Sequence, residues 1–130
     1  MKERIPVAVL AATGSVGQRF AQLLDKHPWF KVVRLAASDR SVGKPYAQAC
    51  RWLLADPMPA ALRDMRVAAA DEPAADIPLV FSALPADAAA EIETLWARAG
   101  ALVCTNASAF RAEPDVPLLL PEVNPQHTAL

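Results

Sequence analysis

The segment VAVLAATGSVGQRF, residues 7–20, constrains the fold more than any other part of this chain. Residues 5–11 form an apolar run without polar alternation, which is typical of a strand buried on both faces of a sheet. Gly14 and Gly17 follow, within a run of small residues. Apolar side chains then recur at helical spacing, and Pro28 predicts that this helix ends near residue 27. The apolar face of the predicted helix comprises Val16, Phe20, Leu23 and Leu24.

Further strands are predicted along the chain. Residues 30–38 (FKVVRLAAS) and 77–84 (IPLVFSAL) are apolar runs bounded by turn residues, and residues 65–70 (MRVAAA) form a shorter one. Residues 101–106 (ALVCTN) give a fifth strand. The segment VPLLLPEVN, residues 116–124, is either a short sixth strand or an extended edge, because its two prolines argue against a central position in a sheet.

A second long helix is predicted within PADAAAEIETLWARAG, residues 85–100. Pro85 precedes the first turn, Asp87 is placed to cap free backbone donors, and Gly100 ends the helix. The predicted apolar face comprises Ile92, Leu95 and Trp96.

Buried strands that alternate with helices predict parallel strands joined by right-handed crossovers. The fold class is therefore α/β, with a doubly wound parallel sheet of the Rossmann type, and residues 1–130 form one domain. Ligands of such sheets bind beyond the carboxyl ends of the strands. The loops to examine are accordingly ATGSVG, SDRS, SALP and NASAFR.

Composition excludes several classes of function. The net charge of -1 and the scattered Lys and Arg residues argue against a nucleic-acid partner. No apolar run is long enough to span a membrane, so a cytoplasmic location is expected. Cys50 and Cys104 lie outside any C-x-x-C motif or His/Cys cluster, so no metal site is predicted and both are expected to be buried, reduced thiols.

The first loop joins a strand directly to a helix, so backbone amides and the helix dipole favour an anion there. A pyrophosphate is the expected guest. Gly14 allows close approach of the phosphate, Gly17 allows close packing of helix and strand, and Thr13 and Ser15 add hydroxyl donors. The alternative is a tight strand-to-helix turn with no ligand.

The second loop, SDRS, follows the second strand, where dinucleotide-binding domains meet the adenosine ribose. Ser38, Arg40 and Ser41 offer donors suited to a 2'-phosphate, which favours NADP. Asp39 is the residue that argues for NAD, because an acid in this loop can bind a free 2'-hydroxyl. A solvated polar turn is the alternative.

Six motifs in this order resemble the amino-terminal cofactor domain of aspartate-semialdehyde dehydrogenases of the archaeal and fungal type. They cover nearly the whole chain. The family makes aspartate 4-semialdehyde from 4-aspartyl phosphate with NADPH, on the route to lysine, threonine and methionine. The motifs are ATGSVGQRFAQLL, HPWF, LAASDRSVGKPY, VFSALPADAAAEIE, AGALVCTNASAFR and DVPLLLPEVNPQH.

The resemblance implies roles for particular residues. Asn106 and Arg111, in NASAFR, would bind the substrate, with the arginine holding its phosphate as a bidentate guanidinium. Without the resemblance, Arg111 is a surface arginine paired to Glu113 or Asp115. The resemblance also implies a homo-oligomer. The implied cofactor residues are Thr13, Gly14, Ser15 and Val16 at the pyrophosphate, Ser38, Arg40 and Ser41 at the 2'-phosphate, and Ser82, Ala83 and Pro85 beside the cofactor.

Two departures from the family pattern stand out. Ala11 occupies a position where the family has glycine, and a positive φ there would cost about 1 kcal/mol. The family's catalytic cysteine and histidine lie beyond PEVN, and neither Cys50, Cys104 nor the histidines match them; His27 is expected in the last turn of a helix and His127 near the chain end. We therefore expect a cofactor domain cut short before the catalytic and dimerisation domain, able to bind NADP but inactive alone.

Two alternatives stay open at this point. N-acetyl-glutamyl-phosphate reductases and malonyl-CoA reductases share the opening loop, although NASAFR and PEVN favour the aspartyl enzyme. A nucleotide-binding module without enzymatic activity is the other.

Overall fold

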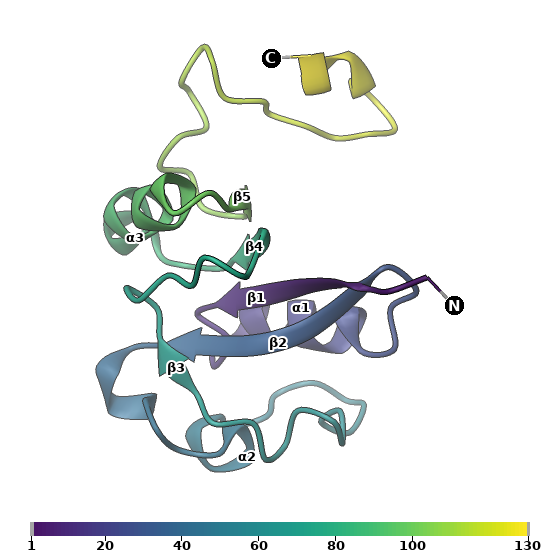
Figure 1. Ribbon diagram of the computed structural model, residues 1–130, viewed down its shortest axis with the longest axis vertical. Coiled ribbons are helices and arrows are strands. Elements are labelled where there is room, and N and C mark those ends of the chain that lie inside the picture. The colour runs from purple at the N-terminus through teal and green to yellow at the C-terminus, as the bar shows by residue number, and fades with distance from the viewer. Residues whose placement is uncertain (1, 130) are drawn as a thin grey trace.

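A computed structural model describes residues 2–129 and contains a five-stranded parallel sheet with the strand order β3-β2-β1-β4-β5 (Figure 1). The doubly wound parallel plan expected from the sequence is confirmed. The elements are β1 (Ile5–Leu10), α1 (Ser15–Leu24), β2 (Phe30–Ala37), η1 (Asp39–Ser41), α2 (Tyr46–Ala49), β3 (Ala68–Ala69), β4 (Leu79–Ser82), α3 (Ala86–Arg98), β5 (Leu102–Thr105) and η2 (Pro125–Ala129).

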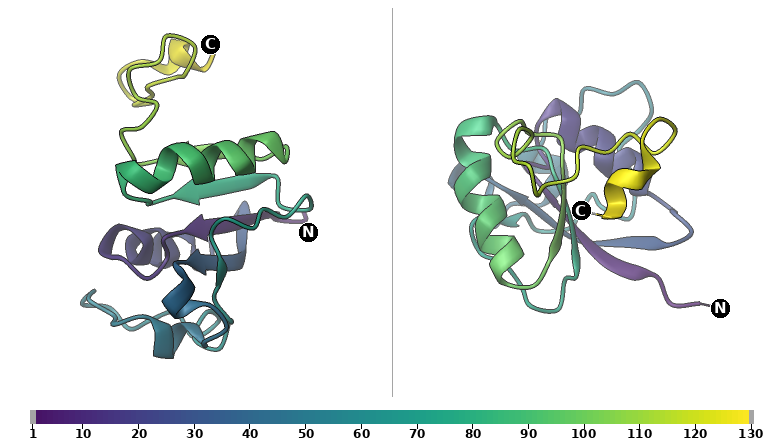
Figure 2. Two further views of the ribbon diagram at one scale, coloured as in Figure 1. Left: turned by 90° about the vertical axis from the view of Figure 1, so that its left-hand side faces the viewer. Right: turned by 90° about the horizontal axis from the view of Figure 1, so that it is seen from above.

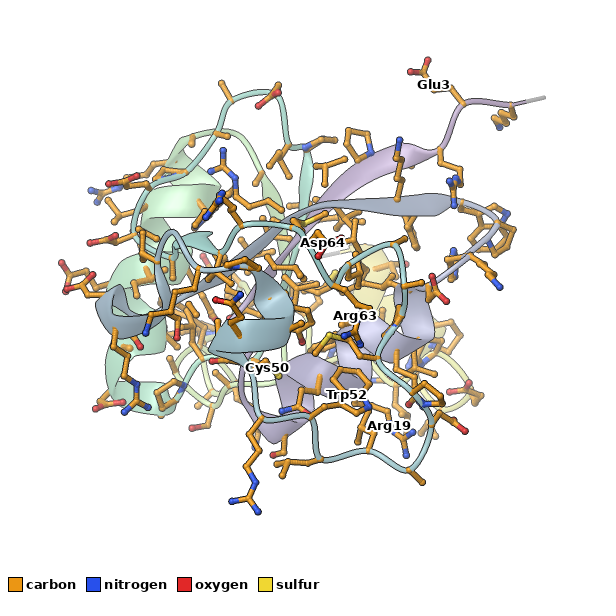
Figure 3. All side chains as sticks on the ribbon, turned by 90° about the horizontal axis from the view of Figure 1, so that it is seen from below. Glu3, Arg19, Cys50, Trp52, Arg63 and Asp64 are labelled. Atoms are coloured by element: carbon orange, nitrogen blue, oxygen red, sulfur yellow. The ribbon has the colours of Figure 1, made fainter. Side chains whose placement is uncertain are left out.

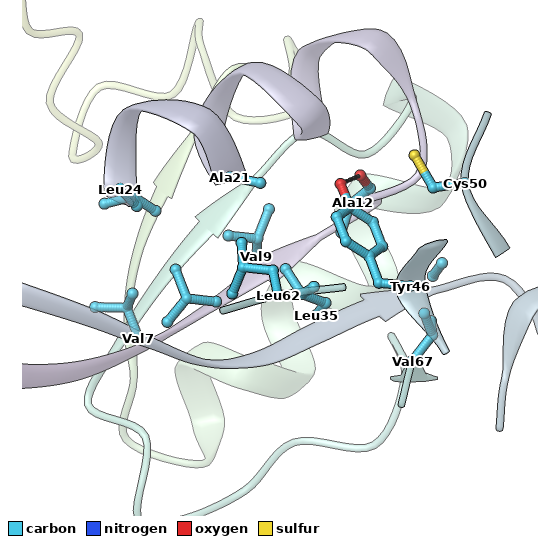
Figure 4. Packing of buried hydrophobic residues seen from close by; sticks show 12 residues of the cluster. Val7, Val9, Ala12, Ala21, Leu24, Leu35, Tyr46, Cys50, Leu62 and Val67 are labelled. Carbon is cyan, nitrogen blue, oxygen red and sulfur yellow. Dashed lines mark hydrogen bonds between the residues drawn. The ribbon is translucent and has the colours of Figure 1, made fainter. Parts of the chain in front are cut away.

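Both faces of the sheet are covered, and β1 divides its side chains between them. Val7 and Val9 belong to the core on the side of α1 and α2, which Figure 4 shows from close by. Ala8 and Leu10 belong to the core on the side of α3. Figure 2 shows α1 and α3 as separate layers on the two sides of the strands. A strand buried on both faces has no polar position, which explains the unbroken apolar run.

Helix α1 confirms half of the predicted apolar face, since Leu24 is buried and Phe20 packs against the core, but the rest of its buried face differs from the prediction. Gly17, Gln18, Ala21 and Leu24 are buried, whereas Val16 and Leu23 are exposed. The small residues Gly17 and Ala21, four apart, let the helix approach the sheet closely, while Val16 and Leu23 point outward. The helix also ends at Leu24, earlier than predicted, because Lys26 has a left-handed backbone with φ 55°.

Helix α3 confirms the prediction that Gly100 ends it. Gly100 has φ 98°, and the amide of Ala101 donates to the carbonyl of Trp96 (3.1 Å), as in a Schellman motif. The start also follows the prediction, since Pro85 precedes the first turn at the N-cap position and the Asp87 carboxylate accepts from the first-turn amide of Ala88 (3.0 Å). The predicted apolar face is confirmed for Trp96, which is buried, and for Ile92, which packs against the core, but Ala89 and Glu93 are buried on this face as well.

The carboxyl-terminal part of the chain leaves the sheet. Residues 116–124 were predicted to form a short sixth strand or an extended edge of the sheet, and both alternatives are wrong, because this segment has no strand and lies in the arm that extends away from β5 (Figures 1 and 2). Cys104 on β5 is exposed, so the expectation of two buried thiols holds only for Cys50. The physical reason is that β5 is the edge strand of the described sheet and leaves one of its faces uncovered.

Candidate dinucleotide-binding site

The loops singled out from the sequence meet at one edge of the sheet. Leu10 pairs with Ala36 on one side and with Ser82 on the other, and Ser82 pairs with Thr105. Strands β1, β2, β4 and β5 therefore reach this edge in one row. The chain turns from β1 toward α1 on one face and from β4 toward α3 on the other. The site thus lies at the point where the order of strands reverses, which is the ligand position of open α/β sheets.

The loop between β1 and α1 has its carbonyl groups turned into the protein. The Tyr46 hydroxyl donates to the Ala12 carbonyl (2.7 Å), and the Gln18 side-chain amide donates to the Thr13 carbonyl (3.0 Å). The Gly14 amide donates to the Ala11 carbonyl (3.2 Å). Tyr46 is fully buried, and burial raises the pKa of its phenol, so the hydroxyl keeps its proton as a donor. These contacts fix the loop from beneath.

Gln18 joins this loop to the segment after α2. Its Nε2 donates to the carbonyls of Thr13 and Arg51 (3.0 Å each), and its Oε1 accepts from the Leu53 amide (2.8 Å). Both donor protons and the acceptor of the buried side chain are therefore satisfied. Figure 3 shows the segment with Cys50 and Trp52 beside α1. The Cys50 thiol adds a longer contact to the Thr13 carbonyl (3.8 Å).

Backbone amides are left free on the opposite, outer side of the loop. Within residues 2–129, the amides of Thr13, Ser15, Val16 and Gly17 have no hydrogen-bond partner. They surround the amino end of α1, where the helix dipole adds a partial positive charge. Ser15 and Val16 are exposed, so a ligand can reach these donors. The arrangement suits an anion such as a pyrophosphate.

The two glycines of the loop have different reasons to be glycine. A Cβ on Gly17 would lie 2.0 Å from the Ala11 carbonyl oxygen, which is a clash with backbone. Gly17 is therefore required by the packing of α1 against the loop. A Cβ on Gly14 would lie 3.7 Å from that oxygen, an ordinary contact, so the described protein does not require glycine there. The open space at Gly14 fits the close approach of a ligand.

Ala11 has a positive φ of 57°, the conformation in which its methyl group is unfavourable. An alanine in this region costs about 1 kcal/mol relative to glycine. Its side chain packs against the core on the α3 side. The strain is therefore a property of the backbone of the loop, and the free amides keep their arrangement despite it.

The predicted 2'-phosphate residues lie in and before η1. Ser38 and Arg40 are exposed beyond β2, as the prediction needs, and so is Asp39. Ser41 is buried, with 5% exposure, and its amide donates to the Ser38 carbonyl (2.9 Å). Of the three predicted donors, Ser38 and Arg40 are thus the accessible ones.

The loops after β4 and β5 place their predicted residues unequally. Ser82 is fully buried, while Ala83 is partly exposed and Pro85 exposed. Asn106 and Arg111 are exposed, and the Arg111 guanidinium donates to the Asn106 carbonyl (3.3 Å) rather than to Glu113 or Asp115. Arg111 is therefore held by its own loop.

Three buried polar residues were missed from the sequence, namely Gln18, Tyr46 and Glu93. A signal was present for two of them. Gln18 lies between the small residues Gly17 and Ala21 on the buried side of α1, and Glu93 lies four residues after Ala89 and three before Trp96. Tyr46, the single tyrosine, gave no such pattern.

The histidines and cysteines form no reactive cluster. His27 lies beyond the end of α1, not in its last turn, and its Nδ1 accepts from the amides of Trp29 (3.1 Å) and Phe30 (3.3 Å). Burial raises the pKa of the Cys50 thiol. Among the described residues, no three His, Cys, Asp or Glu side chains gather to hold a metal ion.

The described helices include none with the length and apolar character that a membrane crossing requires.

The fold and the free amides together define a dinucleotide-binding domain of the doubly wound class. Comparison with known proteins gives the family. The model of the semialdehyde dehydrogenase NAD-binding domain matches residues 6–130, and the chain belongs to this family.

Relatives with closely similar sequences carry one name. The chain is 54% identical over 123 residues to the aspartate-semialdehyde dehydrogenase of Methanothermobacter thermautotrophicus, covering 94% of this chain and 35% of the relative. It is 49% identical over 127 residues to that of Archaeoglobus fulgidus, covering 98% and 37%. The crystal structure of the Candida albicans enzyme with NADP superposes with a TM-score of 0.93 at 43% identity, covering 98% of this chain and 36% of that one. The chain thus spans little more than a third of these relatives.

Proposed function

We propose that this chain is the NADP-binding part of an aspartate-semialdehyde dehydrogenase. The observation that carries the proposal is the set of four free amides at Thr13, Ser15, Val16 and Gly17, fixed from beneath by Tyr46 and Gln18. A structure of the similar Candida albicans enzyme contains NADP, which supports the choice of this cofactor.

In this proposal the chain's own residues bind and orient the cofactor. The amides of the first loop hold the pyrophosphate, and Gly14 leaves room for it. Ser38 and Arg40 bind the 2'-phosphate at the end of β2, where they are exposed. Ala83 and Pro85 border the same edge of the sheet. The bound NADPH supplies the hydride that the reduction needs.

The complete protein is proposed to reduce 4-aspartyl phosphate to aspartate 4-semialdehyde as a cytoplasmic homo-oligomer, with Asn106 and Arg111 contributing to substrate binding. The names of the relatives support this activity. The reaction needs a nucleophilic cysteine. Cys50 is buried with a raised pKa, and Cys104 lies on β5 away from the first loop. We therefore expect residues 1–130 alone to bind cofactor without turning over substrate, and NADPH formation from aldehyde and phosphate would contradict this.

Titration of the chain with NADP and NAD by calorimetry tests the cofactor assignment. The Arg40→Ala variant should weaken NADP binding by about 1.5–3 kcal/mol, the range for hydrogen bonds to charged groups, which is roughly a 10- to 150-fold rise in Kd. NAD binding should hardly change, because NAD lacks the 2'-phosphate. Arg63→Ala, which removes an exposed arginine elsewhere, controls for net charge. Equal losses for both cofactors in Arg40→Ala would reject the 2'-phosphate role.

A further inference from the structure

A buried carboxylate lies behind two of the loops of the site. Glu93 is 3% exposed, at the centre of the buried face of α3 between Ala89 and Trp96. Neither of its carboxylate oxygens has a hydrogen-bond partner among the described residues. A leucine would fill such a position without the penalty of burying a charge. The carboxylate therefore calls for an explanation beyond packing.

Two hydroxyl groups face this carboxylate from the sheet. Ser82 ends β4 and Thr105 ends β5, and the two residues pair directly across the strands. By strand alternation both point to the α3 side, together with Val80 and Val103 of the core on that side. Burial raises the pKa of Glu93, and the hydroxyls of Thr105 and Ser82 act in the opposite direction.

Each hydroxyl also receives an amide from the loop that follows its strand. The Leu84 amide, in the SALP loop, donates to Ser82 Oγ (3.4 Å), and the Ala107 amide, in the NASAFR loop, donates to Thr105 Oγ1 (2.9 Å). Neither hydroxyl donates to another described residue, so both hydroxyl protons are free for Glu93. A hydroxyl that donates to a carboxylate becomes a better acceptor, because hydrogen bonds in a chain polarise one another.

We propose that Glu93 is a positioning residue: its carboxylate, which has no partner in the described structure, accepts hydrogen bonds from the Ser82 and Thr105 hydroxyls when these turn toward it. The two hydroxyl oxygens are thereby directed to the amides that set the paths of the SALP and NASAFR loops. One carboxylate behind the sheet would then hold the start of two neighbouring loops at once. The proposal rests on the proposed function in one respect only, namely that the SALP and NASAFR loops bind the cofactor and the substrate.

The surroundings of Glu93 allow its ionisation to be followed without interference. It borders a cavity of about 510 Å³ whose other charged lining residue is Arg98, on the same helix. Strands β4 and β5 bring Ser82 and Thr105 toward it, and Cys104 lies on the opposite side of β5 by alternation. Glu91, on the same helix but exposed, is a matched control.

NMR of the chain without ligand tests the proposal directly. The amide signals of Leu84 and Ala107 should titrate together, with one apparent pKa above the ordinary range of a glutamate. This titration should disappear in Glu93→Gln and Glu93→Leu and persist in Glu91→Gln. Because burial raises the pKa of Glu93, protonation of this residue favours the folded protein. Its contribution to the free energy of unfolding is fully present below the pKa that Glu93 has in the unfolded chain, and it is lost as pH rises through the pKa of the folded state. The pH dependence of stability should flatten in the same two variants.

Cofactor binding provides the second readout. We expect Glu93→Leu to keep or raise the melting temperature, since it removes a buried charge, and yet to weaken NADP binding severalfold at neutral pH through disorder of the SALP loop. Unchanged Leu84 and Ala107 signals in both variants would overturn the proposal. If Glu93→Leu does not fold, Glu93→Gln, of nearly the same shape, decides alone. A wild-type chain that binds no NADP would contradict the proposed function, and the ligand-free titration would still decide the role of Glu93.

Discussion

The loop between β1 and α1 and the arm of residues 106–129 both contain predicted site residues, but the protein holds them very differently. The loop is fixed by contacts from residues 33 and 34 positions away, through Gln18 with Arg51 and Tyr46 with Ala12. The described hydrogen bonds from residue 107 onward stay within the arm or reach back to Thr105 and Asn106. Four large apolar side chains of the arm are also exposed, namely Leu118, Leu119, Leu120 and Val123.

This difference implies that residues 1–130 hold the loop between β1 and α1 in a fixed conformation but do not hold the arm of residues 106–129 in the same way. The pyrophosphate loop is preorganised by buried residues of the chain itself, so its binding should be measurable in isolation. Arg111 is positioned by one hydrogen bond to its own loop. The substrate-binding role proposed for Arg111 therefore requires contacts beyond those that the described residues supply.

The largest effect should come from Gly17→Ala, which would disrupt the packing of α1 against the loop between β1 and α1. Its Cβ would meet the Ala11 carbonyl at 2.0 Å, so α1 must move away from the loop. We expect a loss of about 3 kcal/mol in the free energy of unfolding, at the upper end of the usual range for overpacking. Urea denaturation followed by Trp fluorescence measures it.

Gly14→Ala is the matched partner, with an ordinary 3.7 Å contact in place of the clash. It should leave stability within about 0.5 kcal/mol and weaken NADP binding instead. A Gly14→Ala variant that is as destabilised as Gly17→Ala would show that the loop is not open on its outer side.

Gln18→Leu should lower the free energy of unfolding by about 2 kcal/mol, because it leaves buried carbonyls and an amide without partners. Its fixed contacts are to Thr13, Arg51 and Leu53. Amide hydrogen exchange should accelerate at Leu53, while the arm is unaffected. The exposed residue Gln48 on α2 gives the control Gln48→Leu. Equal destabilisation by both substitutions would remove Gln18 from its proposed anchoring role.

Ala11→Gly should stabilise the protein by about 1 kcal/mol, since glycine accepts the φ of 57° without strain. Lys26 has a φ of 55° at the other end of α1 and is exposed, so Lys26→Gly relieves similar strain far from the site. Thermal unfolding should show a gain in both variants. A change in NADP affinity is expected only in Ala11→Gly, and an equal change in Lys26→Gly would point to a general effect of stability.

The smallest perturbation is thiol labelling, which leaves the fold intact. Cys104 on β5 is exposed and should react with a maleimide, whereas Cys50 beside the loop is buried and should resist. Burial raises the pKa of both thiols, so the difference in exposure decides the outcome. Mass spectrometry should find a single fast adduct on Cys104. Rapid modification of Cys50 would mean that the segment beside the loop between β1 and α1 opens to solvent.

The sequence predicted the parts of this architecture that depend on local pattern. Apolar runs located β1, β2, β4 and β5, and glycines located the loop and the end of α3. The apolar pattern of α1 located Phe20 and Leu24 on the core side, but the close approach at Gly17 was missed because Gly17 acts through the side chain that it lacks. The contacts of Gln18 with Arg51 and of Tyr46 with Ala12 were missed because they join residues more than thirty positions apart, where the chain folds back. The exposure of Cys104 was missed because an edge strand and a central strand have similar sequences.

The binding of a dinucleotide by the first loop is the central claim, and backbone NMR during NADP titration tests it most directly. The amides of Thr13, Ser15, Val16 and Gly17 should show the largest shifts and saturate together, while those of residues 112–129 stay unchanged. Saturable binding without any shift at these four amides, or no binding at millimolar NADP, would contradict the account.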